Sequence, residues 1–334
     1  MNIMKKVLIT LLVVSLLPVS GCNTAMNSRY TKSGIYFDTI VSVDIYGAAK
    51  DDADRILSEC MNLCDKYQQL FDESIQTSDI YRINTSGSDP VKVGHDTAVL
   101  LDKALDYSKL TGGRFDITID PVSDLWDFHG DNACIPSHDL IADALKRVGY
   151  ENITVDTVND TVSIKGDASV DVGAVAKGYI ADRICEYLSS CPIEGAIINM
   201  GGDLRLTGTK NGRDRFDIGI NDPFSQGSVM ADLCLTDKAV ATSGTYERCF
   251  TIGDRRYHHI LDTATGFPVD TDVESVTVIT DEAVSADCLC TVLIILGSED
   301  GLDLIEKTSD TEAYIIKTDG SVMTSSGMGQ YIRQ

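Results

Sequence analysis

A lysine occupies an interior position in the predicted helix 171–188, DVGAVAKGYIADRICEYL. At about 100° per residue, Lys177 shares a face with Ile180 and Ile184, whereas Asp182 falls on the opposite face, which we expect to meet water. The helix dipole disfavours a cation near the start of a helix, so Lys177 calls for a nearby anion. That anion is either a ligand or an internal carboxylate. The remaining alternative is a side chain that reaches past its neighbours to solvent.

A carboxylate and a hydroxyl lie one helical turn apart in the apolar segment 285–297, SADCLCTVLIILG. Asp287 and Thr291 stand at positions i and i+4, so both project from one side of the predicted helix. Burying these two groups is unfavourable unless each has a partner. Carboxylate and hydroxyl oxygens suit Mg²⁺, which keeps few protein ligands and completes its shell with phosphate oxygens. The alternative is that Asp287 caps the helix start beside Ser285.

The segment 258–269, HHILDTATGFPV, places His259 in a predicted strand close to a tight turn. Turn chemistry accounts for Asp262 and Gly266. A histidine in this position is a candidate general acid or base, because its ordinary pKa lies near neutrality. The glycine pair 201–202 ends another predicted strand, and its backbone could approach a ligand closely.

Short helices and strands follow one another irregularly along the chain and must position these residues. Helical periodicity covers 51–70, 95–113, 139–150, 171–188 and 286–296, and alternating apolar patterns predict strands at 34–47, 153–156, 161–166, 195–202, 217–220, 229–236, 239–244, 249–252, 258–261 and 274–280, with a closing hairpin over 313–327. This order lacks the regular strand–helix alternation of a doubly wound sheet. We therefore predict an α+β fold with mixed or antiparallel sheets.

The N-terminal segment predicts export to the outside of the cell. Two lysines precede an apolar run that is too short for a good membrane-spanning helix and that ends in VSGC. This ending resembles the lipobox of bacterial lipoproteins, so we expect residues 1–21 to be a signal peptide and Cys22 to be lipidated. Residues 22–33 would then be a polar tether and 34–334 a folded domain held on the outer face of the cell membrane.

The chain has 334 residues and a formal net charge of −23. This acidity argues against nucleic acid or an anionic membrane surface as a partner, so we expect contact with the membrane through the lipid anchor only. An anionic ligand must be bound by local features such as a metal ion or helix N-termini. The ten cysteines lack the spacing of a zinc site. Buried free thiols and a Cys185–Cys191 disulfide are both compatible with the sequence.

Six segments follow one another in the order GGRFDIT, DVGAVAKGYIAD, NMGGDLRLTG, ATSGTYER, HHILDTATGFPV and SADCLCTVL. In this order they closely resemble the ApbE family, the FAD:protein FMN transferases, over nearly the whole mature chain. The resemblance implies two intertwined α/β parts with a flavin pocket between them and Mg²⁺ on the pyrophosphate. It also implies transfer of FMN from FAD to a threonine or serine hydroxyl of an extracytoplasmic acceptor redox protein, with release of AMP.

The same resemblance implies roles for individual residues. It places flavin contacts at Phe37, Phe71, Arg114, Phe115, Asp116, Asp171, Lys177 and Leu261, and metal ligands at the Ala174 carbonyl, Asp287 and Thr291. His259 matches the histidine implicated in catalysis, with Asp287 as an alternative base through a metal-bound water. Phe37, Phe71 and Arg114 depart from the usual residues of the family, which leaves the individual flavin contacts open.

Two other activities fit these residues. One is hydrolysis of FAD to FMN and AMP, with water in place of the acceptor. The other is flavin binding without turnover by a carrier lipoprotein. The presence of Lys177 together with the Asp287–Thr291 pair favours an enzyme over a carrier.

Overall fold

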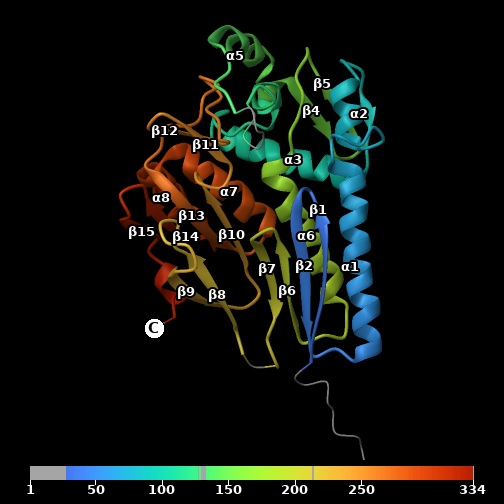
Figure 1. Ribbon diagram of the computed structural model, residues 1–334. Helices are drawn as coiled ribbons and strands as arrows, with labels where there is room; N and C mark the ends of the chain where they lie inside the picture. Colours follow the sequence, from blue (N-terminus) through green and yellow to red (C-terminus); the bar gives the residue numbers. More distant parts are fainter. Residues whose placement is uncertain (1–27, 127, 129–132, 213, 334) are drawn as a thin grey trace, which may run out of the picture.

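A computed structural model describes residues 28–126, 128, 133–212 and 214–333. Its centre is an eight-stranded sheet of order β1-β2-β6-β7-β10-β13-β14-β15, and every pairing in the described sheets is antiparallel (Figure 1). Its strands are β1 (Arg29–Tyr36), β2 (Thr39–Tyr46), β6 (Gly195–Met200), β7 (Asp203–Gly208), β10 (Ala239–Gly244), β13 (Val273–Thr280), β14 (Glu312–Lys317) and β15 (Val322–Thr324). All residues of β13 are buried, because this inner strand is covered on both faces.

Helices cover one face of the central sheet (Figure 1). The α-helices are α1 (Lys50–Phe71), α2 (Asp79–Thr85), α3 (His95–Leu110), α4 (Asp120–Ser123), α5 (His138–Ala144), α6 (Gly173–Ser189), α7 (Ala283–Leu296) and α8 (Ser298–Ile305). α7 is apolar on nearly every side because it packs against α6, β10 and β13 at once. Among the described residues, no helix combines the length and the apolarity needed to cross a bilayer.

The opposite face of the sheet is covered in part by a hairpin of β8 (Phe216–Asn221) and β9 (Val229–Leu235). Phe216 and Leu233 of this hairpin pack with Leu206, Val240 and Ile279 of the central sheet in a second apolar cluster. The central sheet therefore lies between a helical layer and a smaller β layer, which confirms the predicted α+β class.

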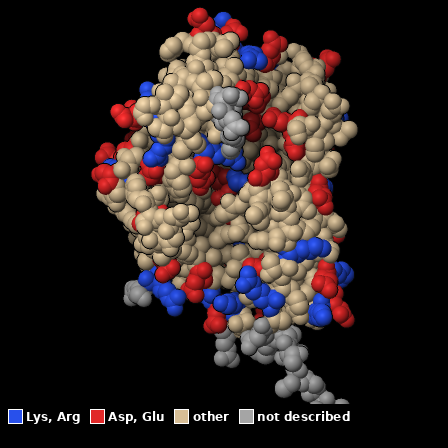
Figure 2. Space-filling model, viewed as in Figure 1, with Lys and Arg blue, Asp and Glu red and all other residues tan. Residues whose placement is uncertain are grey.

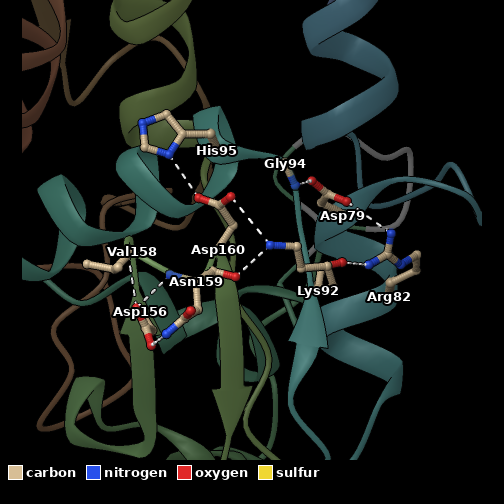
Figure 3. Close-up of polar contacts among 9 residues, drawn as sticks. All are labelled: Asp79, Arg82, Lys92, Gly94, His95, Asp156, Val158, Asn159 and Asp160. Atoms are coloured by element: carbon tan, nitrogen blue, oxygen red, sulfur yellow. Dashed lines mark hydrogen bonds and ion pairs between the residues drawn. The ribbon is translucent and has the colours of Figure 1, made fainter.

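The remaining two sheets lie at one end of the molecule, near α3 and α5 (Figure 1). They are the three-stranded sheet β3 (Val91–Lys92), β5 (Thr161–Ile164) and β4 (Ile153–Asp156), and the hairpin β11 (Cys249–Ile252) with β12 (Arg255–His258). Lys92, His95 and Asp160, which we call the small-sheet cluster, join strand β3 and helix α3 to the β4–β5 turn (Figure 3). Nζ of Lys92 lies 3.5 Å and Nδ1 of His95 lies 2.8 Å from the Asp160 carboxylate.

The N-terminal strands differ from the sequence expectation. Residues 34–47 were expected to form one strand, but β1 and β2 pair as a hairpin through a two-residue turn at Phe37 and Asp38. The φ angles of these residues are +51° and +56°, as in the type I′ turn whose twist matches a right-twisted hairpin. Phe37 therefore lies at the tip of a turn. Residues 29–33, expected within the tether, belong to β1.

The bounds of other elements also differ from those predicted from the sequence. The helix expected over 139–150 is α-helical only to Ala144, and α8 was not expected as a separate helix. The strand expected over 258–261 ends at His258, which leaves His259 in a connecting segment. Cys185 and Cys191 are both free thiols, so the structure contains no disulfide between them.

Candidate active site

A cavity of about 400 Å³ lies where α6, α7 and the ends of the central strands meet the segments around Arg114 and Leu261. Eleven residues selected from the sequence line it, namely Phe37, Arg114, Phe115, Asp116, Asp171, Ala174, Lys177, His259, Leu261, Asp287 and Thr291. Figure 2 shows a surface that is hollowed near its middle, with acidic and basic side chains around the hollow. The fold thus gathers residues that lie far apart in the sequence.

Lys177 lies between two carboxylates in the cavity wall. Its Nζ lies 3.0 Å from Oδ1 and 3.2 Å from Oδ2 of Asp287, and 3.2 Å from Oδ2 of Asp203. The side chain of Lys177 is 25% exposed, whereas those of Asp287 and Asp203 are 4% and 10% exposed. We call these three residues the cavity cluster. The predicted inward direction of Lys177 is confirmed, and its partners are internal carboxylates.

Close packing of α6 against α7 holds the cavity cluster together. A Cβ atom at Gly178 would lie 2.3 Å from the Ala283 carbonyl oxygen, so the approach requires glycine. The Gly178 amide donates to Asp287 Oδ2 at 3.1 Å. Asp182 accepts from the amides of Ala283 and Val284, at 2.8 Å and 3.0 Å, and so caps α7 from the neighbouring helix. The expectation that Asp182 faces water is therefore wrong, and Asp287 is not the cap.

One lysine shares its charge between two acids in this cluster. Burial opposes the charged form of Lys177, but Asp287 and Asp203 raise the pKa of the lysine above its ordinary value. Burial raises the pKa of Asp287, against the effect of Lys177, and the charge of Asp203 adds to the rise. The lysine therefore stays protonated, and the pair of carboxylates would gain from a second cation.

Thr291 and Ala174 add oxygen atoms to the same wall of the cavity. The Gly178 amide, whose acceptor in a regular helix is the Ala174 carbonyl, also lies 3.1 Å from Asp287 Oδ2 and donates to it. The described residues contain no group of three His, Cys, Asp or Glu side chains arranged around a metal. A cation here would depend on one carboxylate, a hydroxyl, a carbonyl and oxygen atoms of the ligand. This hard, incomplete donor set fits Mg²⁺.

His259 lines the cavity directly after β12. Its amide donates to the Arg248 carbonyl at 3.0 Å, and its buried Nδ1 has no hydrogen-bond partner among the described residues. Burial, supported by the charge of Arg248, lowers the pKa of His259 to about 4. The imidazole is therefore neutral at physiological pH.

Two carboxylates expected to contact flavin also have structural partners. Asp116 is buried and accepts from the Thr118 amide at 2.8 Å and from the Tyr150 amide at 2.7 Å, and burial raises its pKa. Asp171 accepts from the Gly173 amide at 2.7 Å, at the start of α6. Asp116 thus secures the segment that forms the cavity wall, while Asp171 supports the helix that carries Lys177.

Phe71 is not brought to the cavity. Its side chain is 2% exposed and packs on the rings of Tyr67 and Tyr179, with centroids 5.5 Å and 6.0 Å away. The ring fills the space between α1 and α6, where the apolar core provides more favourable contacts than the cavity rim. The flavin contact implied for Phe71 by resemblance is therefore not supported by the structure.

Several cavity residues escaped the sequence analysis. Asp203, Glu247, Arg248 and Trp126 all line the cavity. The position of Asp203, directly after the glycine pair 201–202, was the available signal, because a turn at a strand end often presents a functional side chain. Glu247 and Arg248 lie in the ATSGTYER segment, but nothing in their spacing indicates that they face a cavity.

Residues 37–315 match the model of a family described as the ApbE family. A protein of Klebsiella pneumoniae (strain 342) named FAD:protein FMN transferase is 30% identical over 305 residues, which cover 90% of this chain and 93% of the relative. A protein of Treponema pallidum (strain Nichols) with the same name is 29% identical over 343 residues, which cover 97% of this chain and 95% of the relative.

Solved structures show the same fold. The ApbE protein of Thermotoga maritima superposes with a TM-score of 0.84 at 30% identity, over 92% of this chain and 100% of the other. The flavin transferase ApbE of Vibrio cholerae superposes with a TM-score of 0.81 at 26% identity, over 91% of this chain and 99% of the other.

Proposed function

The chain belongs to the ApbE family, and we propose that it transfers FMN from FAD to a threonine or serine hydroxyl of an acceptor protein, with release of AMP. The cavity cluster carries this proposal. A half-buried, protonated lysine and a buried carboxylate that would gain from a second cation stand in one cavity beside Thr291 and His259. Such a wall suits a pyrophosphate. The name shared by the relatives supports FAD as the source of the transferred group.

The cavity offers apolar and charged surfaces for the two parts of a flavin nucleotide. Phe37, Phe115 and Leu261 provide apolar contact area of the kind that holds a planar ring system. Lys177 and Arg248 provide positive charge for the phosphates. A nucleotide would be oriented with its ring against the apolar residues and its phosphates toward the cavity cluster.

Asp287, Thr291 and the Ala174 carbonyl would hold Mg²⁺, and the bound ion would neutralise charge on the pyrophosphate oxygens. Their location in the cavity wall supports this assignment. Lys177 keeps its charge beside Asp287 and adds a fixed positive group at the same place. Because these groups are set before the substrate arrives, little reorganisation accompanies the reaction.

In the transfer, the acceptor hydroxyl oxygen forms a bond to the phosphorus of the FMN half. The bond from this phosphorus to the bridging oxygen breaks, and AMP leaves with that oxygen and its electron pair. His259 is our candidate for the base that takes the hydroxyl proton, because its imidazole is neutral and the residue lines the cavity. Lys177 stabilises negative charge that develops on the departing phosphate.

The proposal is tested by incubating the full chain with FAD, Mg²⁺ and candidate acceptor proteins. Transferase activity gives covalently fluorescent acceptor and AMP in equal amounts. Free FMN with AMP would instead establish a hydrolase, and unchanged bound FAD would establish a carrier. Thr291→Val, which keeps the shape but lacks the hydroxyl, should raise the Mg²⁺ concentration required for half-maximal rate, whereas Thr291→Ser should not. If both variants show the same Mg²⁺ dependence, Thr291 is not a ligand of the metal.

We also propose that the chain is lipidated at Cys22 and held on the outer face of the cell membrane. Support comes from the VSGC junction; the signal peptide 1–21, Cys22 and the tether to residue 27 lie outside the described residues. Cys22→Ala should lose metabolic lipid labelling and membrane retention, while the released domain keeps its activity. Normal labelling and retention in this variant would contradict the lipobox assignment.

A further inference from the structure

A second cavity, of about 230 Å³, adjoins the candidate active site on the β8–β9 face of the central sheet. Residues Ile218 to Asn221 of β8 line one side, and Leu204, Val240 and Thr277 of the central sheet contribute to the rest. Gly201, Thr242 and Glu247 line both cavities. The second cavity, which we call the β8 groove, therefore borders the first.

The edge of β8 that faces away from β9 is available for pairing. On its own outer edge, β9 uses Asp232 and Cys234 to bond the C-terminal segment: the Cys234 amide donates to the Tyr331 carbonyl, and the Arg333 amide donates to the Asp232 carbonyl, each at 2.8 Å. Antiparallel residues alternate between the two edges of a strand. Leu233 and its neighbours at alternate positions must therefore bond β8.

This alternation determines which groups β8 presents to the groove. Because Leu233 pairs with Ile218, the backbone groups of Asp217 and Gly219 point away from β9. Both residues are exposed, and no other strand in the described part of the chain pairs with β8. An unpaired edge beside a groove is a template for an added strand.

The groove has one occupant that the proposed reaction itself requires. An acceptor hydroxyl must reach the phosphates beside Asp287, whose side chain is 4% exposed, and an extended segment can carry one side chain into such a cavity. Thr242 and Glu247 line both the β8 groove and that cavity, and the open edge of β8 at Gly219 supplies main-chain hydrogen-bonding groups. Strand addition binds an extended peptide largely through its backbone.

We propose that an extended segment of the acceptor protein adds to β8 as a strand and thereby delivers its threonine or serine to the active site. This assignment rests on the proposed function. Recognition is then shared between backbone pairing at Gly219 and side-chain contacts with the apolar floor at Leu204 and Val240. Because pairing reads the backbone, short unstructured peptides are sufficient as acceptors.

The test begins with a library of short random peptides, each with a single threonine, offered to the full chain with FAD and Mg²⁺. The best flavinylated peptide is then remade with one N-methylated amide at a time. Strand addition predicts that turnover falls at alternate positions only, since every second amide faces β8. If N-methylation lowers turnover equally at every position, or at none, the assignment is wrong. This result requires no variant of the protein.

Two variants of Gly219 test the same edge from the side of the protein. Both Gly219→Pro and Gly219→Ala add a carbon near Val229, where a Cβ would lie 3.0 Å from Cγ1, but only proline removes the outward amide. We expect the KM for the peptide to be roughly fivefold higher for the proline variant than for the alanine variant, as one lost hydrogen bond implies. Flavin fluorescence quenching should report the same FAD affinity for both.

The possible results distinguish a failure of the β8 assignment from a failure of the proposed transferase function. Equal peptide KM values for the two folded Gly219 variants, with normal flavinylation, would overturn the β8 assignment and leave the transferase intact. A wild-type chain that flavinylates neither peptides nor proteins would overturn the proposed function and the groove assignment together. If Gly219→Pro does not fold, the N-methylation pattern on the wild-type chain decides the matter.

Discussion

The cavity cluster and the small-sheet cluster combine the same kinds of charged groups in different surroundings. In the cavity cluster, the side chains of Lys177 and Asp287 are 25% and 4% exposed. In the small-sheet cluster, those of Lys92 and Asp160 are 69% and 25% exposed, and His95 is 69% exposed (Figure 3). Contact distances near 3 Å occur in both clusters.

Burial, more than contact distance, separates the two clusters. Around Asp160, water screens the charges, and an exposed pair contributes little beyond joining two segments. Around Asp287, removal from water makes each charge depend on its partner and raises the pKa of the carboxylate. A buried cluster that contains two carboxylates and only one lysine is suited to bind a cation and, through that cation, a phosphate. The predictions below test this difference, beginning with the largest expected effect.

Asp287→Ala should reduce Mg²⁺-dependent AMP release by roughly a thousandfold, because the site loses its only carboxylate toward the proposed metal. Lys177 retains Asp203 as a partner, so the variant should still fold. Asp287→Asn, with the same shape and no charge, is the matched control for the carboxylate. If Asp287→Ala is destabilised yet keeps its Mg²⁺ dependence, the residue has only a structural role.

Lys177→Met should lower the free energy of unfolding by about 3 kcal/mol, because Asp203 and Asp287 would remain buried without their cation. From helical periodicity alone, methionine would fit the apolar face of the helix without loss of stability. The two buried carboxylates reverse that expectation. Urea unfolding near neutral pH measures the loss. The double variant Lys177→Met/Asp287→Asn should recover part of the lost stability. If Lys177→Met alone is as stable as the wild type, Lys177 does not compensate the charge of the two carboxylates.

His259→Gln should flatten the dependence of stability on pH. The folded pKa of His259 is about 4 against an ordinary value of 6.5, so between these values only the unfolded chain binds the proton. Stability from this residue is therefore present above pH 6.5 and is lost as the pH falls toward 4, by about 3 kcal/mol. Urea unfolding across this range measures the slope. The exposed His95→Gln is the control, and equal slopes for both variants would contradict the argument.

Asp160→Asn should have the smallest effect. The carboxylate loses its ion pairs with Lys92 and His95, but these partners are largely exposed and return to water. The rate of FMN transfer should remain at the wild-type value, and the midpoint of urea unfolding should change only slightly. A marked loss of transfer in this variant would show that the small-sheet cluster takes part in the function.

The sequence by itself determined features that depend on local periodicity. Lys177 faces inward, and Asp287 and Thr291 line one cavity, because residues three and four apart share one side of any α-helix. The α+β class followed from the irregular order of elements, which excluded a doubly wound sheet. The ordered motifs added the family, which the match over residues 37–315 confirms.

Only the tertiary structure decided how these elements meet. Lys177 and Asp287 are 110 residues apart, and their pairing depends on the close approach of two helices at Gly178. The same packing turns Asp182 into the cap of α7. Phe71, at the end of α1, is drawn into the core rather than to the cavity. Periodicity gives the side of a helix on which a residue lies, whereas its partner across the interface depends on distant segments that a local pattern does not contain.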